Sequence, residues 1–388
     1  MTNTPHETRW VTEQVRSIAS IGTGAKDTQD RVAKGRYPFF VRSQKIEQID
    51  SWSYDGEAVL TAGDGVGTGK VFHYINGKFD YHQRVYRISN FRQDVSGKFF
   101  FYQFSRNFLA RIESLTAKSS VDSVRMEAIA GMAIDIPPRD EQDLIVEAIG
   151  DTDDLITTME KMITKKRAIR QGMMQQLLTG KTRLPGFTAE WASCSIRDLA
   201  DQHRGAVTPN SQPNLVFQHF SLPAFDSGEM AVLERGSSID SNKFRVPPGA
   251  VLLSKLNPRI PRVWAPSEIL RNAVSSTEFI VLIPKGTTNR SFLKWLLKSE
   301  RVTGRMALLA TGTTGSHQRM HPQQVAQLEV DVPSEVNEQS AIAAALDDAE
   351  QSIESLRIQL GKARSVRNGM MQELLTGRTR LQHAEVAV

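Results

Sequence analysis

The chain has 388 residues, of which 40% are hydrophobic and 23% are charged, and its formal net charge is +5. This length suggests two domains or a repeated pair, and the single cysteine, Cys194, excludes a disulfide framework and a cysteine-built metal site. No apolar run approaches the roughly 18 residues of a membrane span, and no signal pattern begins the chain, so we expect a cytoplasmic protein with no membrane partner.

The basic surplus lies in two segments of the chain. Lys and Arg outnumber Asp and Glu in residues 1–136 and 185–332, whereas residues 137–184 are neutral and residues 333–388 are acidic. Basic globular segments favour a polyanion such as nucleic acid as a partner. We therefore predict two domains, 1–136 and 185–332, each followed by a segment of different character.

The first unusual stretch in chain order is the glycine-rich run TAGDGVGTGKVFHY, from Thr61 to Tyr74. A Walker A loop would need glycine in place of Asp64 and Ser or Thr in place of Val71, so the run does not fit a nucleotide-binding motif. It predicts instead a strand, a glycine turn and a second strand, followed by a hairpin at Asn76–Gly77.

Polar side chains near this turn suit a phosphate backbone. We predict that Thr68, Lys70 and Lys78 contact phosphates, because glycines allow close approach of the backbone and these residues supply hydroxyl and ammonium donors. A plain structural turn explains Gly63 and Gly65 at least as well.

The chain contains an internal repeat. GMMQQLLTGKTRL, from Gly172 to Leu184, returns as GMMQELLTGRTRL, from Gly369 to Leu381, with 11 of 13 positions identical. The match extends back to the paired EQ dipeptides at 141–142 and 338–339. Such self-similarity at a fixed offset indicates two copies of one architecture.

The ends of each copy also correspond. IDIPP at 134–138 matches VDVPS at 330–334, which predicts a short strand, a proline stop and then a long helix in both copies. More faintly, Trp10 with the following VRSIA corresponds to Trp191 with the following IRDLA. The interiors share almost nothing, so we expect conserved frames around diverged domains.

Each copy ends in a predicted long helix, the first of about 57 Å from Glu141 to Leu178. Apolar residues recur at alternating steps of four and three, the pattern of a coiled-coil seam that needs a partner helix. The residues predicted to pair the helices are Ile145, Ile149, Ile156, Ile163, Ile342, Leu346, Ile353 and Leu360. An ordinary surface helix on each domain is the alternative.

Charge predicts the direction of this pairing. In both long segments acidic residues come first and basic residues last, as with Asp151 and Arg170 in the first and Asp348 and Arg367 in the second. This order suits each helix dipole, and it brings opposite charges together only in an antiparallel pair. We therefore predict that the two helices pack antiparallel.

Two further loops have the composition of a nucleic-acid contact. SKLNPRIPR at 254–262 is basic and stiffened by prolines, and LATGTTGSHQRM at 309–320 is rich in hydroxyl groups. With the corresponding loop of the first copy, the candidate DNA contacts are Lys118, Ser119, Ser254, Lys255, Asn257, Arg259, Arg262, Thr313, Thr314, Ser316 and His317. A solvated surface loop is the alternative for each.

The repeated GMMQ-LLTG segments have more apolar residues than one helix seam can bury. A methionine-rich surface adapts to a binding partner, so we predict partner docking by Met173, Met174, Leu177, Met370, Met371 and Leu374. Core packing at the helix ends is the alternative. No catalytic residues and no metal site can be assembled from the spacing of the titratable residues.

This layout resembles the specificity subunit of type I restriction-modification systems. The resemblance covers nearly the whole chain and is carried by the doubled EQ…GMMQ-LLTG-TRL segments, the strand-proline entries IDIPPRDEQ and VDVPSEVNEQ, and the opening GRYPFFVRSQKI at 35–46. The loop TGTTGSHQRM is similar to a loop common in the target-recognition domains of this family. Its counterpart AKSSVDSVRM departs from that pattern by lacking glycines.

The resemblance implies an α+β fold with an internal pseudo-two-fold repeat. Two mainly β-rich target-recognition domains, 1–136 and 185–332, would be separated by two conserved spacer helices, in segments 137–184 and 333–388, that form an antiparallel coiled coil. It also implies a non-catalytic subunit without a cofactor of its own. Each domain would then read one half of a bipartite site in double-stranded DNA.

The partners implied by the resemblance are two methyltransferase subunits, which use S-adenosylmethionine, and nuclease/translocase subunits. The helices would set the spacing between the half-sites and dock the methyltransferase. Two other classes stay open at this point: a methyltransferase-fused enzyme, which would bind a methyl donor, and a protein-only scaffold, which would not bind duplex DNA.

Overall fold

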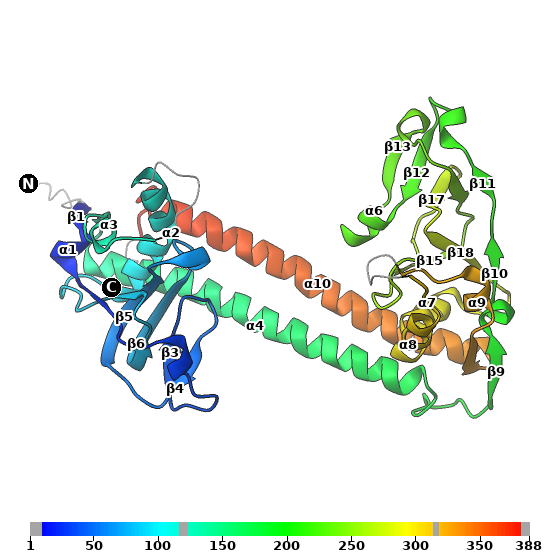
Figure 1. Cartoon of the computed structure of the whole chain (residues 1–388), viewed down its shortest axis with the longest axis horizontal. Helices are drawn as coiled ribbons and strands as arrows, with labels where there is room; N and C mark the ends of the chain where they lie inside the picture. The colour runs from blue at the N-terminus through cyan, green and yellow to red at the C-terminus, as the bar shows by residue number, and fades with distance from the viewer. Residues whose placement is uncertain (1–9, 116–122, 313–317, 382–388) are drawn as a thin grey trace, which may run out of the picture. The chain divides into compact units, whose positions relative to one another are not determined.

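The computed structural model describes residues 10–115, 123–312 and 318–381, which form an α+β fold (Figure 1). The chain folds into two compact units: Met1–Met159 with Gln359–Val388, and Glu160–Ile358. Each of the two long helices therefore contributes residues to both units. We call these the first unit and the second unit.

A six-stranded sheet forms the body of the first unit. Its order is β2 (Ser20–Thr23), β7 (Val85–Ser89), β5 (Tyr54–Ala62), β6 (Phe72–Tyr81), β3 (Tyr37–Phe40) and β4 (Glu47–Ile49), and only β3 and β6 run parallel. Helix α2 (Gly97–Leu115) presents Phe100, Phe104 and Phe108 to the core at four-residue spacing. Phe104 and Phe108 also lie edge-on to Phe72 of β6, with ring centroids 5.7 and 6.2 Å apart, which anchors the helix to the sheet.

The glycine turn predicted between two strands is confirmed, since residues 63–71 connect β5 to the antiparallel β6. The hairpin predicted at Asn76–Gly77 is wrong. Strand β6 runs through both residues, and Gly77 pairs with Gly56 of β5. Both glycines have a φ of +140°, which residues with a side chain rarely adopt, so the Asn-Gly pair here shapes a strand instead of a turn.

Two sheets make up most of the second unit. The four-stranded sheet has the order β10 (Ala200–His203), β18 (Phe279–Pro284), β15 (Val251–Ser254) and β16 (Val263–Trp264). The five-stranded sheet has the order β11 (Ala206–Val207), β14 (Lys243–Arg245), β17 (Ala273–Ser276), β12 (Val216–Phe220) and β13 (Val232–Arg235). Helices α7 (Arg290–Lys298) and α8 (Glu300–Leu308) pack on the four-stranded sheet through Phe292, Leu296 and Met306.

Short elements frame both units in the same way. In the first unit β1 (Val11–Gln14) pairs with β8 (Ala133–Ile136). Helix α1 (Val15–Ile18) follows β1, and helix α3 (Met126–Ala130) precedes β8. In the second unit β9 (Trp191–Ser195) pairs with β19 (Glu329–Pro333), accompanied by α5 (Ile196–Leu199) and α9 (Pro322–Ala326). Helix α6 (Leu222–Asp226) is a further short element of the second unit.

The strand connections of the two units also correspond. In the first unit β5 pairs with β6 and β7, and β7 pairs with β2. In the second unit β15 pairs with β16 and β18, and β18 pairs with β10, again with every pair antiparallel. The loop at 63–71 and the loop at 255–262 therefore occupy the same place in the connectivity.

The two predicted long helices are confirmed as α4 (Arg139–Leu177) and α10 (Val336–Leu374), each directly after its strand and proline. In the first unit Ile145 and Ile149 of α4 pack with Leu374 of α10. In the second unit Leu177 of α4 packs with Ile342 of α10. Within each unit, earlier residues of one helix thus meet later residues of the other, which is the order of antiparallel neighbours.

The residues predicted to pair the helices face inward with one partial exception. Ile145, Ile149, Ile163, Ile342, Leu346, Ile353 and Leu360 are buried, and Ile156 is half-buried. Ion pairs follow the predicted charge order within each unit, Arg367 with Asp153 in the first and Arg170 with Glu350 in the second.

The repeated EQ and TRL residues form the same clasp in each unit. In the first unit Arg380 holds the buried Glu141 through two bonds of 2.6 Å, and the Trp10 indole donates to the same carboxylate at 3.2 Å. In the second unit Arg183 binds Glu338 at 2.5 and 2.7 Å, and Trp191 donates at 3.4 Å. The clasp fastens the segment after one helix to the start of the other.

The glutamine of each EQ pair holds the loop that leads into a helix of its own unit, α2 in the first unit and α7 in the second. Gln142 is fully buried, donates to the carbonyls of Asp94 and Pro137 at 2.8 and 2.9 Å, and accepts from the Ser96 N–H at 2.8 Å. Gln339 repeats this pattern with the carbonyls of Thr287 and Pro333 and the N–H of Asn289. These glutamines therefore serve the frame and not a ligand.

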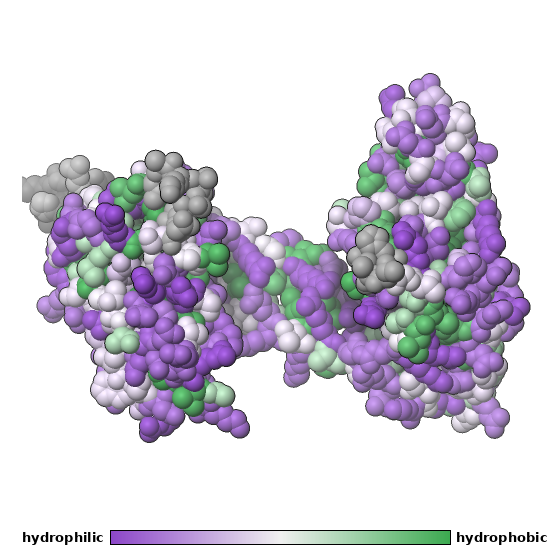
Figure 2. Space-filling view, viewed as in Figure 1, coloured by the Kyte–Doolittle hydropathy of each residue, from purple (hydrophilic) through white to green (hydrophobic). Residues whose placement is uncertain are grey.

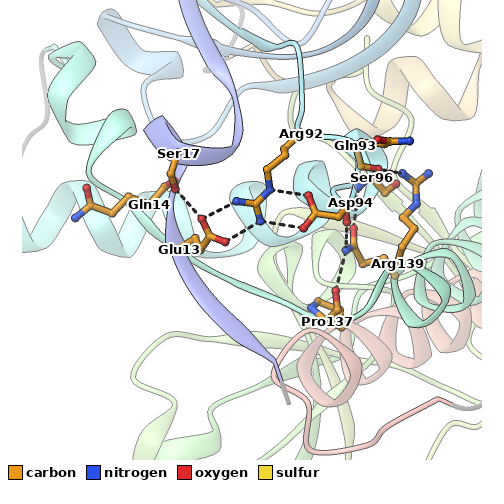
Figure 3. A network of polar contacts seen from close by, with 10 residues as sticks. Glu13, Gln14, Ser17, Arg92, Gln93, Asp94, Ser96, Pro137 and Arg139 are labelled. Carbon is orange, nitrogen blue, oxygen red and sulfur yellow. Dashed lines mark hydrogen bonds and ion pairs between the residues drawn. The ribbon is translucent and has the colours of Figure 1, made fainter. Parts of the chain in front are cut away.

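Charged side chains extend this junction in the first unit. Arg92 lies between Glu13 of β1 and Asp94, with two bonds to each carboxylate (Figure 3). These bonds lower the pKa of both carboxyls, the Arg92 bond being the largest cause in each case. Arg139 of α4 reaches the Gln93 carbonyl at 3.3 Å, so strand, loop and long helix meet at one polar cluster.

Candidate nucleic-acid interface

Two other segments of the first unit converge on the glycine loop. The Gly63 N–H donates to the Arg84 carbonyl at 2.8 Å, and a Cβ on Gly67 would lie 2.5 Å from the Arg42 carbonyl. Glycine is needed at Gly67 because only a residue without a side chain allows this approach. The loop is thereby fixed between Arg42, two residues after β3, and the β6–β7 turn.

Of the residues predicted to contact phosphate, Lys70 fits the role best. It is exposed at the end of this loop and makes no ion pair with any residue of the described ranges. The Thr68 side chain is only 4% exposed and its hydroxyl is buried, so it offers no surface to a phosphate. Lys78 lies six residues along β6 from Phe72, roughly 20 Å from the loop, with its ammonium 4.7 Å from the Trp52 ring centroid. It is therefore not part of the same group.

Sequence reasoning missed an arginine cluster beside this loop. Asp64, at the base of the loop, accepts from Nη1 of Arg42 at 2.9 Å and lies 3.7 Å from Nε of Arg84. Burial, with the charge of Arg42, lowers the pKa of His82, whose ring accepts from the Arg84 N–H at 2.9 Å. A hollow of about 390 Å³ lies between Arg42 and the loop tip, where Val66 is 99% exposed. The segments are far apart in sequence, so no local pattern indicates the cluster.

The corresponding loop of the second unit presents fewer free groups than the sequence suggests. Ser254 is buried, and its hydroxyl bonds the Leu256 backbone. Nε and Nη2 of Arg262 donate hydrogen bonds to the Asp226 carboxylate at 2.7 and 3.0 Å. Arg259 is exposed and Lys255 is half-buried, and the structure gives neither an ion pair within the described part of the chain.

Asn257 shapes this loop through its backbone. Its φ is +48°, and its N–H donates to the Gln318 carbonyl at 2.8 Å. A left-handed conformation is tolerated by asparagine better than by most residues, which gives Asn257 a structural reason to be present. The predicted contacts Lys118, Ser119, Thr313, Thr314, Ser316 and His317 lie outside the described residues.

The residues predicted to dock a partner lie mainly in the cores of the units. Met174, Leu177 and Leu374 are buried, while Met173, Met370 and Met371 are half-buried against the same cores. Core packing, the alternative reading of these segments, accounts for them. Figure 2 shows hydrophobic patches on the surface of the long helices. The exposed apolar residues of these helices include Leu155, Met162, Ile169, Ile358 and Val366.

Within residues 10–115, 123–312 and 318–381, no three His, Cys, Asp or Glu side chains are grouped so as to hold a metal ion. The helices of these ranges include none with the length and apolar character of a membrane span.

Comparison with known proteins gives consistent results. Residues 7–167 match the family described as type I restriction modification DNA specificity domain. The type I restriction enzyme EcoDI specificity subunit of Escherichia coli is 24% identical over 66% of this chain. The match spans 63% of that relative's length.

Two solved structures share the fold at 13% identity. The S subunit of a type I restriction-modification system from M. genitalium has a TM-score of 0.68, covering 96% of this chain and 98% of its own. A chain from a structure on complex assembly and conformational transition of the type I system has a TM-score of 0.54, covering 97% and 99%. Residues 7–167 thus match the type I restriction modification DNA specificity domain, and over nearly its whole length the chain shares its fold with the two solved structures.

Proposed function

We propose that this chain is the DNA sequence-recognition subunit of a type I restriction-modification complex and that each unit reads one half of a bipartite site. The observation that carries the proposal is the equivalent placement of two loops, 63–71 and 255–262, on equivalent strands of the two units. Each loop carries one exposed basic residue that makes no ion pair with the described residues: Lys70 in the first loop and Arg259 in the second. Such cations suit phosphate oxygens.

The proposal includes an internal pseudo-two-fold repeat. The duplicated clasps and the duplicated glutamine contacts support it, because unrelated domains would not share five hydrogen-bonding roles at matching positions. In this proposal the variable domains are 1–136 and 185–332, and the frame comprises 137–184 and 333–388.

The long helices would form an antiparallel coiled coil that sets the spacing between the half-sites. A helix of 39 residues is about 58 Å long, which exceeds one DNA turn of about 34–36 Å. The ion pairs of Arg367 and Arg170 and the buried seam residues support the antiparallel arrangement.

Docking of two methyltransferase subunits is the second role of these helices in the proposal. Leu155, Met162 and Ile169 recur at seven-residue intervals on α4, so they share one side of the helix, and they are 48%, 43% and 51% exposed. An exposed apolar row of this kind suits a partner helix. The partner would use S-adenosylmethionine, and nuclease/translocase subunits would join for cleavage, while this chain contributes no catalytic group.

Mapping of modified adenines tests the proposal. The chain is expressed with its methyltransferase subunit in a methylation-free host, and the genome is sequenced by a method that detects methylated adenine. We expect one motif with two short defined halves around a fixed gap, which vanishes when this chain is omitted. Methylation that persists without the chain, or that lacks a split motif, would contradict the proposed function.

A further inference from the structure

The arginine cluster at the glycine loop, formed by Arg42, Arg84 and Asp64, has no role in the helix frame, and a phosphate contact does not explain why Asp64 orients Arg42. Arg42 follows β3, Asp64 begins the loop after β5, and Arg84 lies in the turn before β7. Backbone contacts at Gly63 and Gly67 fix the three segments against one another. Loops that converge on a rigid sheet are where binding residues are usually found.

Asp64 binds only one of the three guanidinium nitrogens of Arg42. The bond uses Nη1 at 2.9 Å, and the described residues offer no hydrogen bond to Nε or Nη2 of Arg42. The Arg42 side chain is 46% exposed beside the hollow, whereas the Asp64 side chain is 22% exposed. Arg42 therefore keeps a fixed orientation while its two-donor edge stays open.

An open, oriented two-donor edge matches one ligand in particular. Guanine presents two acceptors, O6 and N7, side by side in the major groove, and a bidentate arginine is the commonest specific contact to that pair. Lysine cannot replace this fork, because it is a point charge on a flexible stem. In the second unit Arg262 uses its Nε–Nη2 edge to bind Asp226, and its side chain is only 16% exposed, so this edge is not open to a base.

We propose that Arg42 reads a guanine of the half-site recognised by the first unit and that Asp64 is the positioning residue that orients it. The inference rests on the proposed function and deepens it by naming a base and its reader. The exposed Arg84 and Lys70 add charge near the same loop and bind the phosphate backbone without selecting a base.

The test uses the complex of the full chain with its methyltransferase, after the wild-type motif has been mapped. Arg42→Lys keeps the charge and removes the fork, and Arg106→Lys on α2 is the matched control for an exposed arginine elsewhere in the same unit. We expect Arg42→Lys to relax the motif at one guanine of one half-site, while the other half and the control motif stay unchanged.

Binding to synthetic duplexes gives a second readout that does not depend on methylation. Replacing the target guanine by 7-deazaguanine removes N7, and it should weaken the wild-type complex roughly 5- to 150-fold while leaving the Arg42→Lys complex nearly unaffected. Asp64→Asn should lose part of the discrimination at that same base pair, with unchanged binding to unrelated duplex and unchanged thermal unfolding.

The outcomes separate this inference from the proposed function. A mapped split motif that Arg42→Lys leaves intact, or a loss of binding that is uniform across sequences, would overturn the guanine reading while the proposed function stands. A first-unit half-site without guanine would do the same. Absence of any split motif for the wild type would remove both.

Discussion

Gln142 provides the sharpest test of how the frame is held together. Its side chain is fully buried and joins three backbone groups: the N–H of Ser96 and the carbonyls of Asp94 and Pro137. Gln142→Ala removes all three partners. A buried backbone group left without a partner costs about 1–3 kcal/mol, and entry of water into the space would recover part of that. We therefore expect a loss of about 3 kcal/mol from the first unit.

Peptide-resolved hydrogen exchange is the suitable assay because it reports each unit separately, whereas a single unfolding transition is not assured in a chain with two units. A loss of about 3 kcal/mol corresponds to roughly 10²-fold faster exchange of protected amides in the first unit. Gln339→Ala should shift the second unit by a similar amount, and the exposed Gln372→Ala should change neither.

The isosteric Gln142→Glu adds a pH dependence with a definite sign. A buried carboxylate facing two carbonyls is disfavoured, so its folded pKa would lie above the unfolded value of about 4.3. The folded state would then be most stable below that unfolded pKa and would lose stability as pH rises through the folded pKa. The reasoning fails if Gln142→Ala changes exchange less than about fivefold, or if both units respond equally.

Further predictions concern the candidate interface, the clasp and the helix surface. Lys70→Ala should weaken DNA binding similarly for all sequences and lower the salt dependence by about one ion, measured by titration across salt concentrations; an unchanged slope would contradict a phosphate contact. Thr68→Val should leave binding unchanged and stability unchanged or slightly higher, because the hydroxyl is buried and unpaired. Arg380→Ala should destabilise the first unit by about 1–3 kcal/mol in hydrogen exchange, since it leaves a buried carboxylate with one donor. Met162→Glu with Ile169→Glu should abolish copurification of the methyltransferase while the helix content stays constant; intact assembly would move docking elsewhere.

The sequence predicted those parts of the fold that depend on local periodicity or on the repeat. The long helices, their strand-proline entries and the positions of the residues that pair the helices follow from residue spacing, because a heptad pattern and a proline each act within a few residues. The prediction of a turn at Asn76–Gly77 was wrong because an Asn-Gly pair can also lie within a strand, where Gly77 pairs with Gly56 of the neighbouring strand. Only the pairing register distinguishes the two cases.

The site was predicted only in part, for a physical reason. An exposed lysine such as Lys70 can be inferred from composition, but burial cannot, so the Thr68 hydroxyl and the Met174 side chain were assigned to surfaces they do not reach. The Arg42–Asp64 pair joins positions 22 residues apart through sheet geometry. Nothing in either local sequence indicates that contact.

The clasp on Glu141 has a consequence for the order in which the chain folds during synthesis. Its partner Arg380 is made 239 residues later, which takes roughly 10–50 s at about 5–20 residues per second. The second unit, Glu160–Ile358, is continuous in sequence and is complete before that arginine leaves the ribosome. The core around Ile145 and Phe99 lacks Leu374 and Leu375 throughout that interval. The unit made first is thus finished last, and its core stays open on the side that Leu374 and Leu375 later cover.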